Sequence, residues 1–287
     1  MFRPWFNINL PSDPDHNIMI SPYNMGAFKN ILSIADVPSE LSIKTNLNSL
    51  FQNHFDHVPK DLLDIDYIYC LNALRSISWG GKIPVGVPCP KCSFSNHTII
   101  DSEQDLKLQG DPTALIKTDL DGNEIIFRST NLLYHRELLS CKAPEEFLRV
   151  SLFNTMYTVN GVPFDHDRTG FDAWYEVLTS EQLGTLSGAV GKIPQYVINI
   201  DFLCMNCGHC DPNMKLNNHV AILKLLLQSG HSLANFYTQT SMMVNEHKYR
   251  LEDIHNCLPY EFELYVKMLT EYVKKKNEEH EKNSQTK

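Results

Sequence analysis

The sequence predicts an α+β protein that is mainly helical, with small β-hairpins around a cluster of four cysteines and a C-terminal helical segment. Apolar residues recur at helical spacing near both ends of the chain. Two Cys-x-x-Cys pairs, at 89–92 and 204–207, lie beside segments that alternate or are rich in β-branched residues. Helices and strands that occupy separate stretches of sequence are typical of the α+β class.

Residues 1–81 are expected to form an N-terminal segment that begins extended and continues as helices. Residues 24–35 and 41–55 carry apolar side chains at helical intervals. The strongest helical pattern is KDLLDIDYIYCLNALRSISWGG, residues 60–81, which follows Pro59 and ends at two glycines. This segment is therefore expected to contribute helices to the core.

A cysteine-containing hairpin region with an inserted subdomain is expected over residues 82–216. Residues 82–101 predict a strand, a turn and a second strand, and Asp121-Gly122 supplies the turn of another hairpin in ALIKTDLDGNEIIFRST. A mainly helical insertion is expected over about 131–192, with one helix beginning near Pro144. The alternating apolar residues of QYVINIDF then predict a half-buried strand that leads to Cys204.

From the cysteine cluster onward the chain is expected to be helical, in particular over residues 217–276. The segment NNHVAILKLLLQSG ends at Gly230. The last segment, LPYEFELYVKMLTEYVKKK, carries apolar residues along one side, namely Phe262, Tyr265, Val266, Leu269 and Val273. Residues 277–287 have no large apolar side chain to bury, which predicts a disordered tail.

The charge of the chain argues against nucleic acid as the main partner. There are 25 Lys and Arg against 34 Asp and Glu, a formal net charge of −9, whereas binding to phosphate backbones uses a broad basic field. The N-terminal stretch MFRPWFNINLPSDPDHN has prolines and acidic residues in place of a secretory signal, and no stretch predicts a membrane span. We expect a soluble protein whose eight cysteines stay reduced in a cytoplasm.

The two Cys-x-x-Cys pairs predict a zinc-ribbon-like site. Such a turn lets two thiolates converge on one ion, and zinc in structural sites takes four ligands in a tetrahedron. The candidate ligands are Cys89, Cys92, Cys204 and Cys207. Residues 93–203 separate the pairs, so the ion would join two distant segments. The entropic cost is modest, because loop-closure entropy grows only with the logarithm of loop length.

Three alternatives remain open for these cysteines. Cys210 or His209 replaces one of the four ligands, because CMNCGHC offers three thiols and an imidazole. Alternatively, the thiols stay reduced without a metal. Redox chemistry is the third alternative, although neither pair opens a helix in a βαβ unit. A closed four-cysteine site has no open coordination position, so zinc would be structural there.

Two polar clusters are interpreted as local structure. Residues 165–168 group two aspartates, a histidine and an arginine between Pro163 and Gly170, where polar side chains are usually solvated. His54 and His57 are interpreted as a helix end and a linker. The sequence has no Gly-rich phosphate loop, GxSxG elbow or HExxH helix. No catalytic residue is predicted.

The order of these motifs resembles a known family. LLDIDYIYCLNALRSISWGG precedes a CPKC hairpin that is followed by NHTIID. A later strand leads to CMNCG, and the chain closes on LPYEFELYVKMLTEYVKKK. This order is similar to that of the baseplate protein family of T-even-like contractile-tailed bacteriophages, over roughly residues 20–275. The resemblance implies a non-enzymatic role at the baseplate hub or in its assembly, with other phage tail proteins as partners.

Two functions follow as hypotheses. The first is a tail-baseplate protein, either a hub component or a hub-assembly factor. It would reside in the virion tail baseplate or in the host cytoplasm during tail assembly, and would make contacts through the aromatic helix 258–276 or bury that stripe internally. The second is a zinc-ribbon nucleic-acid-binding regulatory protein, which the cysteine pairs favour and the net charge disfavours. An enzyme with a cleft near residues 165–168 has the least support.

Overall fold

The structure is a computed structural model of the 287-residue chain, and it describes residues 4–36, 49–58, 62–130, 141, 143–217, 219–227 and 233–285. Its helices are α1 (Met25–Asp36), α3 (Asp64–Ser78), α5 (Pro144–Thr155), α6 (Arg168–Tyr175), α7 (Ser180–Val190), α8 (His219–Leu227), α9 (Leu233–Asn245), α10 (Leu251–Asn256) and α11 (Pro259–Gln285). Its strands are β1 (Phe6–Asn9), β2 (Asn17–Ile20), β3 (Lys82–Pro88), β4 (Ser95–Asp101), β5 (Leu106–Gln109), β6 (Ile116–Leu120), β7 (Asn123–Phe127), β8 (Met156–Val159), β9 (Val162–Pro163), β10 (Gln195–Leu203) and β11 (Cys210–Leu216).

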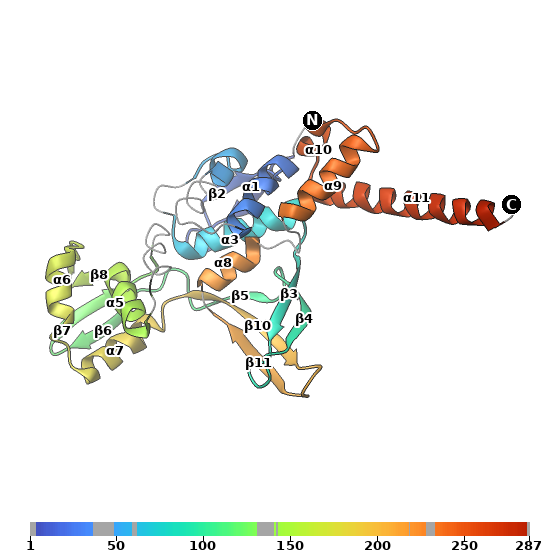
Figure 1. Cartoon of the computed structure of the whole chain (residues 1–287). Helices are drawn as coiled ribbons and strands as arrows, with labels where there is room; N and C mark the ends of the chain where they lie inside the picture. The colour runs from blue at the N-terminus through green and yellow to red at the C-terminus, as the bar shows by residue number, and fades with distance from the viewer. Residues whose placement is uncertain are drawn as a thin grey trace.

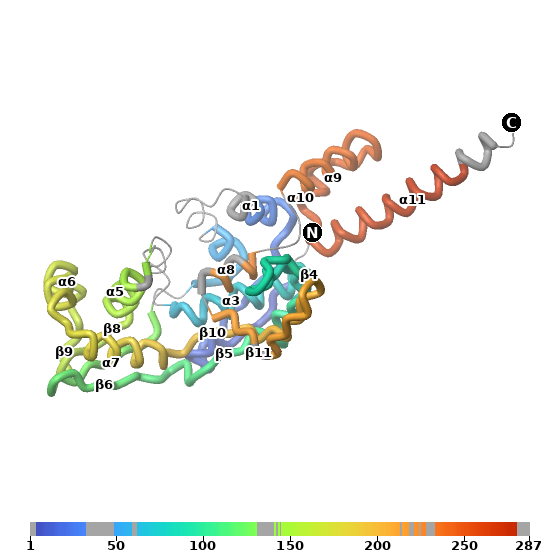
Figure 2. Tube along the Cα trace, turned by 60° about the horizontal axis from the view of Figure 1, so that its bottom comes forward, coloured from blue at the N-terminus to red at the C-terminus, as the bar shows by residue number. Residues whose placement is uncertain are grey.

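The molecule has a central body with three extensions. The body contains α1, α3 and α8, and a lobe built from β6–β9 and α5–α7 lies at one end of it (Figure 1). The long helix α11 projects from the opposite end, and the paired strands β3–β4 and β10–β11 extend from a third side. The view in Figure 2 shows the same separation of the lobe from α11.

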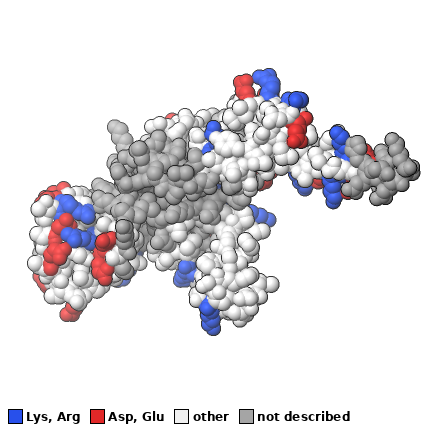
Figure 3. All heavy atoms as spheres, viewed as in Figure 1, with Lys and Arg blue, Asp and Glu red and all other residues white. Residues whose placement is uncertain are grey.

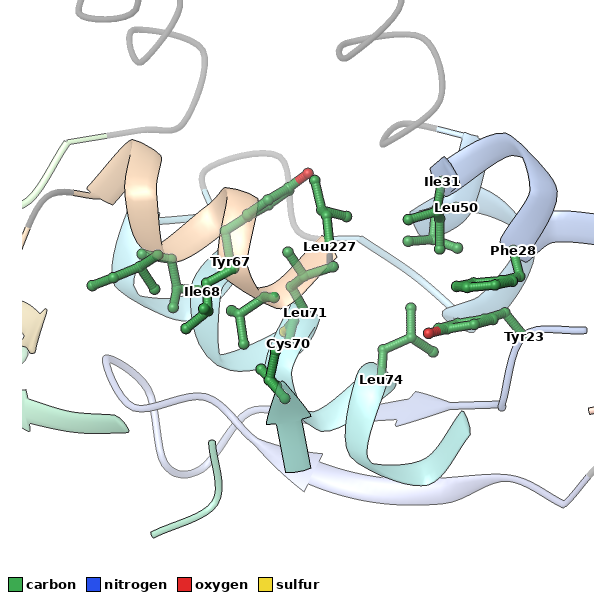
Figure 4. Close-up of a cluster of buried hydrophobic side chains, with 14 of the residues drawn as sticks. Tyr23, Phe28, Ile31, Leu50, Tyr67, Ile68, Cys70, Leu71, Leu74 and Leu227 are labelled. Atoms are coloured by element: carbon green, nitrogen blue, oxygen red, sulfur yellow. The ribbon is translucent and has the colours of Figure 1, made fainter. Parts of the chain in front are cut away.

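The main core lies in the body, around α3. Side chains from α1, α3 and α8 meet there, among them Phe28, Leu71, Leu74 and Leu227 (Figure 4). Each of these four is at most 7% exposed. Because they come from three helices far apart in the sequence, this cluster is what holds the body together.

Sequence features at both ends of α3 favour a helix at this position. Asp64 and Asp66 lie in its first turn and Arg75 lies in its last turn, where each charge complements the helix dipole. Gly80 follows with a φ of 99°, a conformation that glycine adopts readily, and its N–H donates to the carbonyl of Ser76 at 3.1 Å. The helix predicted over 60–81 therefore occupies Asp64–Ser78.

A buried arginine joins α3 to its neighbours. Arg75 is 2% exposed, and its guanidinium donates to the carbonyl oxygens of Leu226 and Lys82, each at 3.4 Å. Burial lowers the pKa of Arg75, while the nearby Tyr23 and Glu263 oppose that shift. These contacts place α8, β3 and the start of α11 around one end of α3.

The hairpins that carry the cysteines are antiparallel. The predicted hairpin over 82–101 is present, because β3 pairs with β4 from Lys82↔Asp101 to Pro88↔Ser95. β10 lies between β5 and β11, and its alternating apolar residues are buried as predicted. The expectation of helix directly after the cysteine cluster was wrong, because residues 210–216 form β11. These residues form a strand because their backbone groups pair with the edge of β10, and the local sequence does not predict that pairing.

The lobe has a core of its own. Strands β6–β9 form one four-stranded antiparallel sheet, and α5, α6 and α7 contribute to the same apolar cluster. The predicted turn between β6 and β7 has Asp121 and Gly122 at φ values of 54° and 80°, as a type I′ turn requires. The insertion expected to be mainly helical over about 131–192 also contains β8 and β9, and residues 131–140 and 142 lie outside the described part. The described chain is thus a mixed helix and strand structure, with more strand than "mainly helical" implies.

The C-terminal part is helical, as expected. It contains α8, α9, α10 and α11, and the predicted stop at Gly230 lies outside the described residues. Helix α11 continues to Gln285, through most of the residues 277–287 that were expected to be disordered. In the described part of the chain, no helix combines the length and the apolar character that crossing a membrane requires.

Replacing Leu74 by alanine should strongly destabilise the body. Leu74 is 0% exposed, so Leu74→Ala should lower the free energy of unfolding by about 2–5 kcal/mol through lost burial and a cavity. The same change at Leu115, which is 50% exposed, is the matched control and should change it by less than about 0.5 kcal/mol. Denaturant unfolding of the full chain measures both. Equal effects of the two variants would contradict the described core.

Candidate metal centre

Two turns bring the four predicted ligands together. Cys89 and Cys92 lie between β3 and β4, and Cys204 and Cys207 lie between β10 and β11. The Sγ atoms of Cys89 and Cys207 are 3.7 Å apart, and those of Cys92 and Cys204 are 3.6 Å apart. All four sulfurs lie within 4.8 Å of one another. The two pairs therefore meet across the hairpins, although residues 93–203 separate them in the sequence.

The backbones of the two turns have the same hydrogen-bond pattern. In each turn the N–H of the first cysteine donates to the carbonyl five residues later, which is Phe94 at 2.9 Å in one turn and His209 at 2.8 Å in the other. The carbonyl of that cysteine accepts from the N–H four residues later, which is Ser93 at 2.8 Å or Gly208 at 2.9 Å. Ser93 and Gly208 both have left-handed backbones, with φ values of 58° and 71°. The repeated geometry directs the two sulfurs of each pair to the same side.

The spacing of the sulfurs fits a tetrahedral zinc ion. Zn–S bonds of about 2.3 Å at the tetrahedral angle place neighbouring sulfurs about 3.8 Å apart. Two sulfur–sulfur distances between the turns, 3.6 and 3.7 Å, approach that edge length. They are far longer than the S–S bond of about 2.05 Å in a disulfide. Four thiols in this arrangement offer a complete ligand set for one metal ion.

Hydrogen-bond donors lower the pKa of two of the thiols. The N–H of Phe94, and then the side-chain amide of Asn206, lower the pKa of Cys92. Burial opposes ionisation of Cys204, but the N–H groups of Cys207 and Asn206 lower its pKa to about 6. Both shifts make the thiolate, which is the form that binds a metal, easier to reach.

The raised pKa of the Cys207 thiol indicates why the cluster favours a cation. The N–H of His209 acts to lower the pKa of Cys207, but the adjacent sulfurs of Cys92, Cys204 and Cys89 raise it to about 12. Thiolates this close repel one another, so the last protons leave readily only when positive charge replaces them. A divalent cation between the sulfurs would supply that charge.

The two alternative ligands lie beside the cluster. Cys210 begins β11, where it pairs with Leu203, and its side chain is exposed. His209 contributes its carbonyl to the second turn, and its ring lies 6.3 Å from the ring of Phe202 between centroids. Among the described residues, the group of sulfur atoms close enough to share an ion contains neither of them.

Asn96 joins the two turns and was missed by the sequence reasoning. Its Oδ1 accepts from the N–H of Met205 at 2.9 Å, and its Nδ2 donates to the carbonyl of Phe94 at 3.1 Å. The side chain is only 6% exposed. Its one sequence signal is its position four residues after Cys92. Nothing local to Asn96 reveals its partner, because Met205 lies 109 residues away along the chain.

The residues 165–168 have a local structural role. Asp167 is the N-cap of α6 and accepts from the N–H groups of Thr169 at 3.1 Å and Gly170 at 3.0 Å. A hollow of about 440 Å³ lies beside it, lined mainly by apolar side chains together with Asp165 and Asp167. Because capping engages both carboxylate oxygens of Asp167, the arrangement is that of a helix start.

The two histidines interpreted as a helix end and a linker lie at those positions. His54 ends a short helix over 49–54, and its carbonyl accepts from the N–H of Ser21 at 2.8 Å. His57 follows at the surface. The structure brings it to His16, a residue that the sequence reasoning did not single out.

The fold and the site together define a mixed helix and strand protein with a four-cysteine cluster between two hairpins. A family model described as T4 bacteriophage base plate protein matches residues 4–224. Since the match covers most of the chain, the protein belongs to this family of phage baseplate proteins. The match ends within α8, so the C-terminal motif used for the resemblance lies beyond it. Curated proteins and solved structures give no match.

Replacing Asn96 by alanine should weaken the contact between the turns. The variant loses both hydrogen bonds of a buried amide, so we expect Asn96→Ala to lower the free energy of unfolding by about 1–3 kcal/mol. Asn199→Ala, an exposed position on β10, is the control and should change it by at most about 0.5 kcal/mol. Denaturant unfolding measures the difference. An Asn96→Ala variant as stable as the control would show that Asn96 does not join the turns.

Proposed function

We propose that this protein is a non-enzymatic component of the phage tail baseplate, acting at the hub or in hub assembly, with a structural zinc ion at the four cysteines. The observation that carries the baseplate assignment is the family match over residues 4–224. The cysteine geometry supports the zinc ion, because the sulfur spacing fits a tetrahedron and leaves no coordination position open for a substrate.

The proposed zinc ion would hold the β3–β4 hairpin against the β10–β11 hairpin. Its ligands would be Cys89, Cys92, Cys204 and Cys207. Apart from these cysteines, the small apolar cluster at the site consists of Val87, Phe202 and Met214. Because this cluster is small, it buries little apolar area. The metal would therefore supply much of the stability of this part of the fold.

Purified protein should contain about one zinc per chain, measured by elemental analysis. The Cys89→Ser, Cys204→Ser double variant should lose the zinc and unfold at a lower temperature, because two thiolate ligands are gone. Cys210→Ser is the matched control, since Cys210 is exposed and outside the cluster, and it should keep the metal. Stoichiometric zinc in the double variant would contradict this ligand assignment.

Helix α11 is the surface proposed to contact other baseplate proteins. One side of its first turns packs on the body, where Phe262 is 2% exposed. The stripe on its other side, defined here as Leu264, Met268 and Tyr272, is 53–58% exposed. From Thr270 to Glu279 every side chain is exposed, and the helix extends away from the body (Figure 1). The aromatic helix therefore divides its apolar residues between the core and solvent.

The shape and charge of this stripe favour a helical partner. Its residues are spaced by four, which places them in one row along α11, as in a helix that packs on another helix. Beside the first turns of α11 lies a hollow of about 460 Å³, lined by residues of α9 and α11 that include Gln239 and Tyr260. Lys274, Lys275 and Lys276 follow the stripe directly. We therefore propose an amphipathic helix of another tail protein, with acidic residues near one end, as the occupant.

Quantitative mass spectrometry of virions, free tails and infected-cell lysate tests the function. A baseplate component should be present at a fixed small number of copies per particle. The Leu264→Ser, Met268→Ser, Tyr272→Ser variant should fold like the wild type, since these side chains are exposed, but should be depleted from particles at least about tenfold, a loss of 1.4 kcal/mol or more in docking. Thr270→Ser, Asn277→Ser is the control, because both positions are exposed on α11 away from the stripe, and it should be incorporated normally.

The outcomes of that experiment separate the proposed roles. Chain that is abundant in lysate and absent from particles would be an assembly factor that leaves before completion. Equal incorporation of the stripe variant and its control would contradict the role of α11. Absence of any accompanying phage protein in either sample would contradict the baseplate function itself.

The nucleic-acid alternative has less support. The net charge is −9, and the face shown in Figure 3 has acidic and basic side chains intermixed on the lobe. Arg149 there pairs with Asp172 at 2.9 Å and with Glu176 at 3.0 Å. Cations already paired with carboxylates offer little attraction to phosphates. Strong binding to DNA or RNA that weakens steeply with salt would favour this alternative.

A further inference from the structure

Two histidines meet at the surface of the N-terminal part of the chain. His16 lies in the turn between β1 and β2, and His57 lies just after the bridge that pairs Ile20 with Phe55. Their Nε2 atoms are 3.0 Å apart, and the two rings are tilted by 50°. Their side chains are 37% and 48% exposed, so both rings are accessible from solvent.

The backbone around the pair is anchored on both sides. The N–H of Asp56 donates to the carbonyl of Met19 at 3.0 Å, and the N–H of Met19 donates to Asp56 Oδ1 at 2.9 Å. On the other side, the N–H of His16 donates to the carbonyl of Asp13 at 3.0 Å. The backbone segments that carry the two rings are therefore joined by hydrogen bonds other than the contact between the rings.

Each ring has a carboxylate on the side away from the other ring. His57 Nδ1 is 3.0 Å from Asp56 Oδ1, and His16 Nδ1 is 3.9 Å from Asp13 Oδ2. The 3.0 Å contact with Asp56 favours the proton on Nδ1 of His57, which leaves the lone pair of that ring on Nε2. A carboxylate behind an imidazole is the common support of a metal-binding histidine.

Two Nε2 lone pairs at 3.0 Å repel, unless both point toward a shared cation beside the line that joins them or one ring turns its proton inward. A metal ion meets the first condition. Tetrahedral zinc with Zn–N bonds of about 2.0–2.1 Å separates two nitrogens by about 3.3 Å. Neighbouring positions of a square-planar ion at similar bond lengths are about 2.9 Å apart. The observed 3.0 Å lies between these values.

We propose that His16 and His57 form a second metal site, separate from the cysteines, for a divalent first-row ion that prefers imidazole, such as Ni²⁺, Cu²⁺ or Zn²⁺. Asp56 and Asp13 are positioning residues that orient the rings. The two histidines leave coordination positions open toward solvent, where water or a side chain of another protein completes the site. A bound ion joins the β1–β2 turn to the segment that follows residues 49–54.

The test is calorimetric titration of the full-length protein with Ni²⁺, after its cysteines have been loaded with zinc. Wild type should bind one Ni²⁺ per chain, with zinc content unchanged afterwards by elemental analysis. His16→Gln and His57→Gln should each weaken Ni²⁺ binding at least about tenfold, and Asp56→Asn should weaken it by about 10–100-fold, as loss of an orienting partner does. His97→Gln, an exposed histidine on β4, is the control and should bind as wild type does.

A thermal-unfolding readout checks the same proposal by another route. Ni²⁺ should raise the unfolding temperature of wild type and of His97→Gln, because the ion binds only the folded arrangement. It should leave the His16→Gln, His57→Gln double variant unchanged. Absence of a Ni²⁺ equivalent in wild type, or equal binding in the double variant, would overturn the metal site and leave the pair as a hydrogen bond between two imidazoles. Neither result bears on the baseplate assignment.

Discussion

The convergence of four cysteine sulfurs from two distant segments is the contact on which the arrangement of the chain depends. The sulfurs lie within 4.8 Å of one another, at the tips of the β3–β4 and β10–β11 hairpins. The chain between them leaves the body, builds the lobe and returns as β10. Contact between the two tips therefore closes a loop that contains the whole lobe, and closing this loop adds only a logarithmic entropic term.

The lobe and the body each have a separate core of buried apolar residues. The body collects its apolar residues around α3, whereas the lobe collects Phe127, Leu152, Leu186 and their neighbours. Among the described residues, no buried side chain belongs to both clusters. Separate cores allow each part to keep its internal packing while the hairpins and connecting strands set how the parts are joined. Such a construction suits a protein of an assembly, where distinct surfaces contact distinct neighbours.

The outer surfaces differ in chemistry according to the elements that form them. The stripe on α11 is apolar and followed by lysines, which favours a partner helix with a complementary acidic end. The N-terminal turn instead presents two imidazoles supported by carboxylates, which favours a metal ion. Both lie away from the cysteine cluster in sequence, so substitutions at each can be examined with the hairpins intact.

The sequence by itself determined much of the local structure and indicated which four cysteines form the cluster. Helix α3, both hairpin turns and β10 follow from periodicity and from residues such as Gly80 and Gly122, because these signals act over a few neighbouring residues. Only the tertiary structure decided that β11 is a strand, that Asn96 bridges the turns and that His16 meets His57. β11 pairs with the strand that precedes it, although Asp211 and Pro212 disfavour a strand, and the other two contacts join residues that lie 109 and 41 positions apart. A contact of that kind has no local periodicity, so it arises only when packing brings the two segments together.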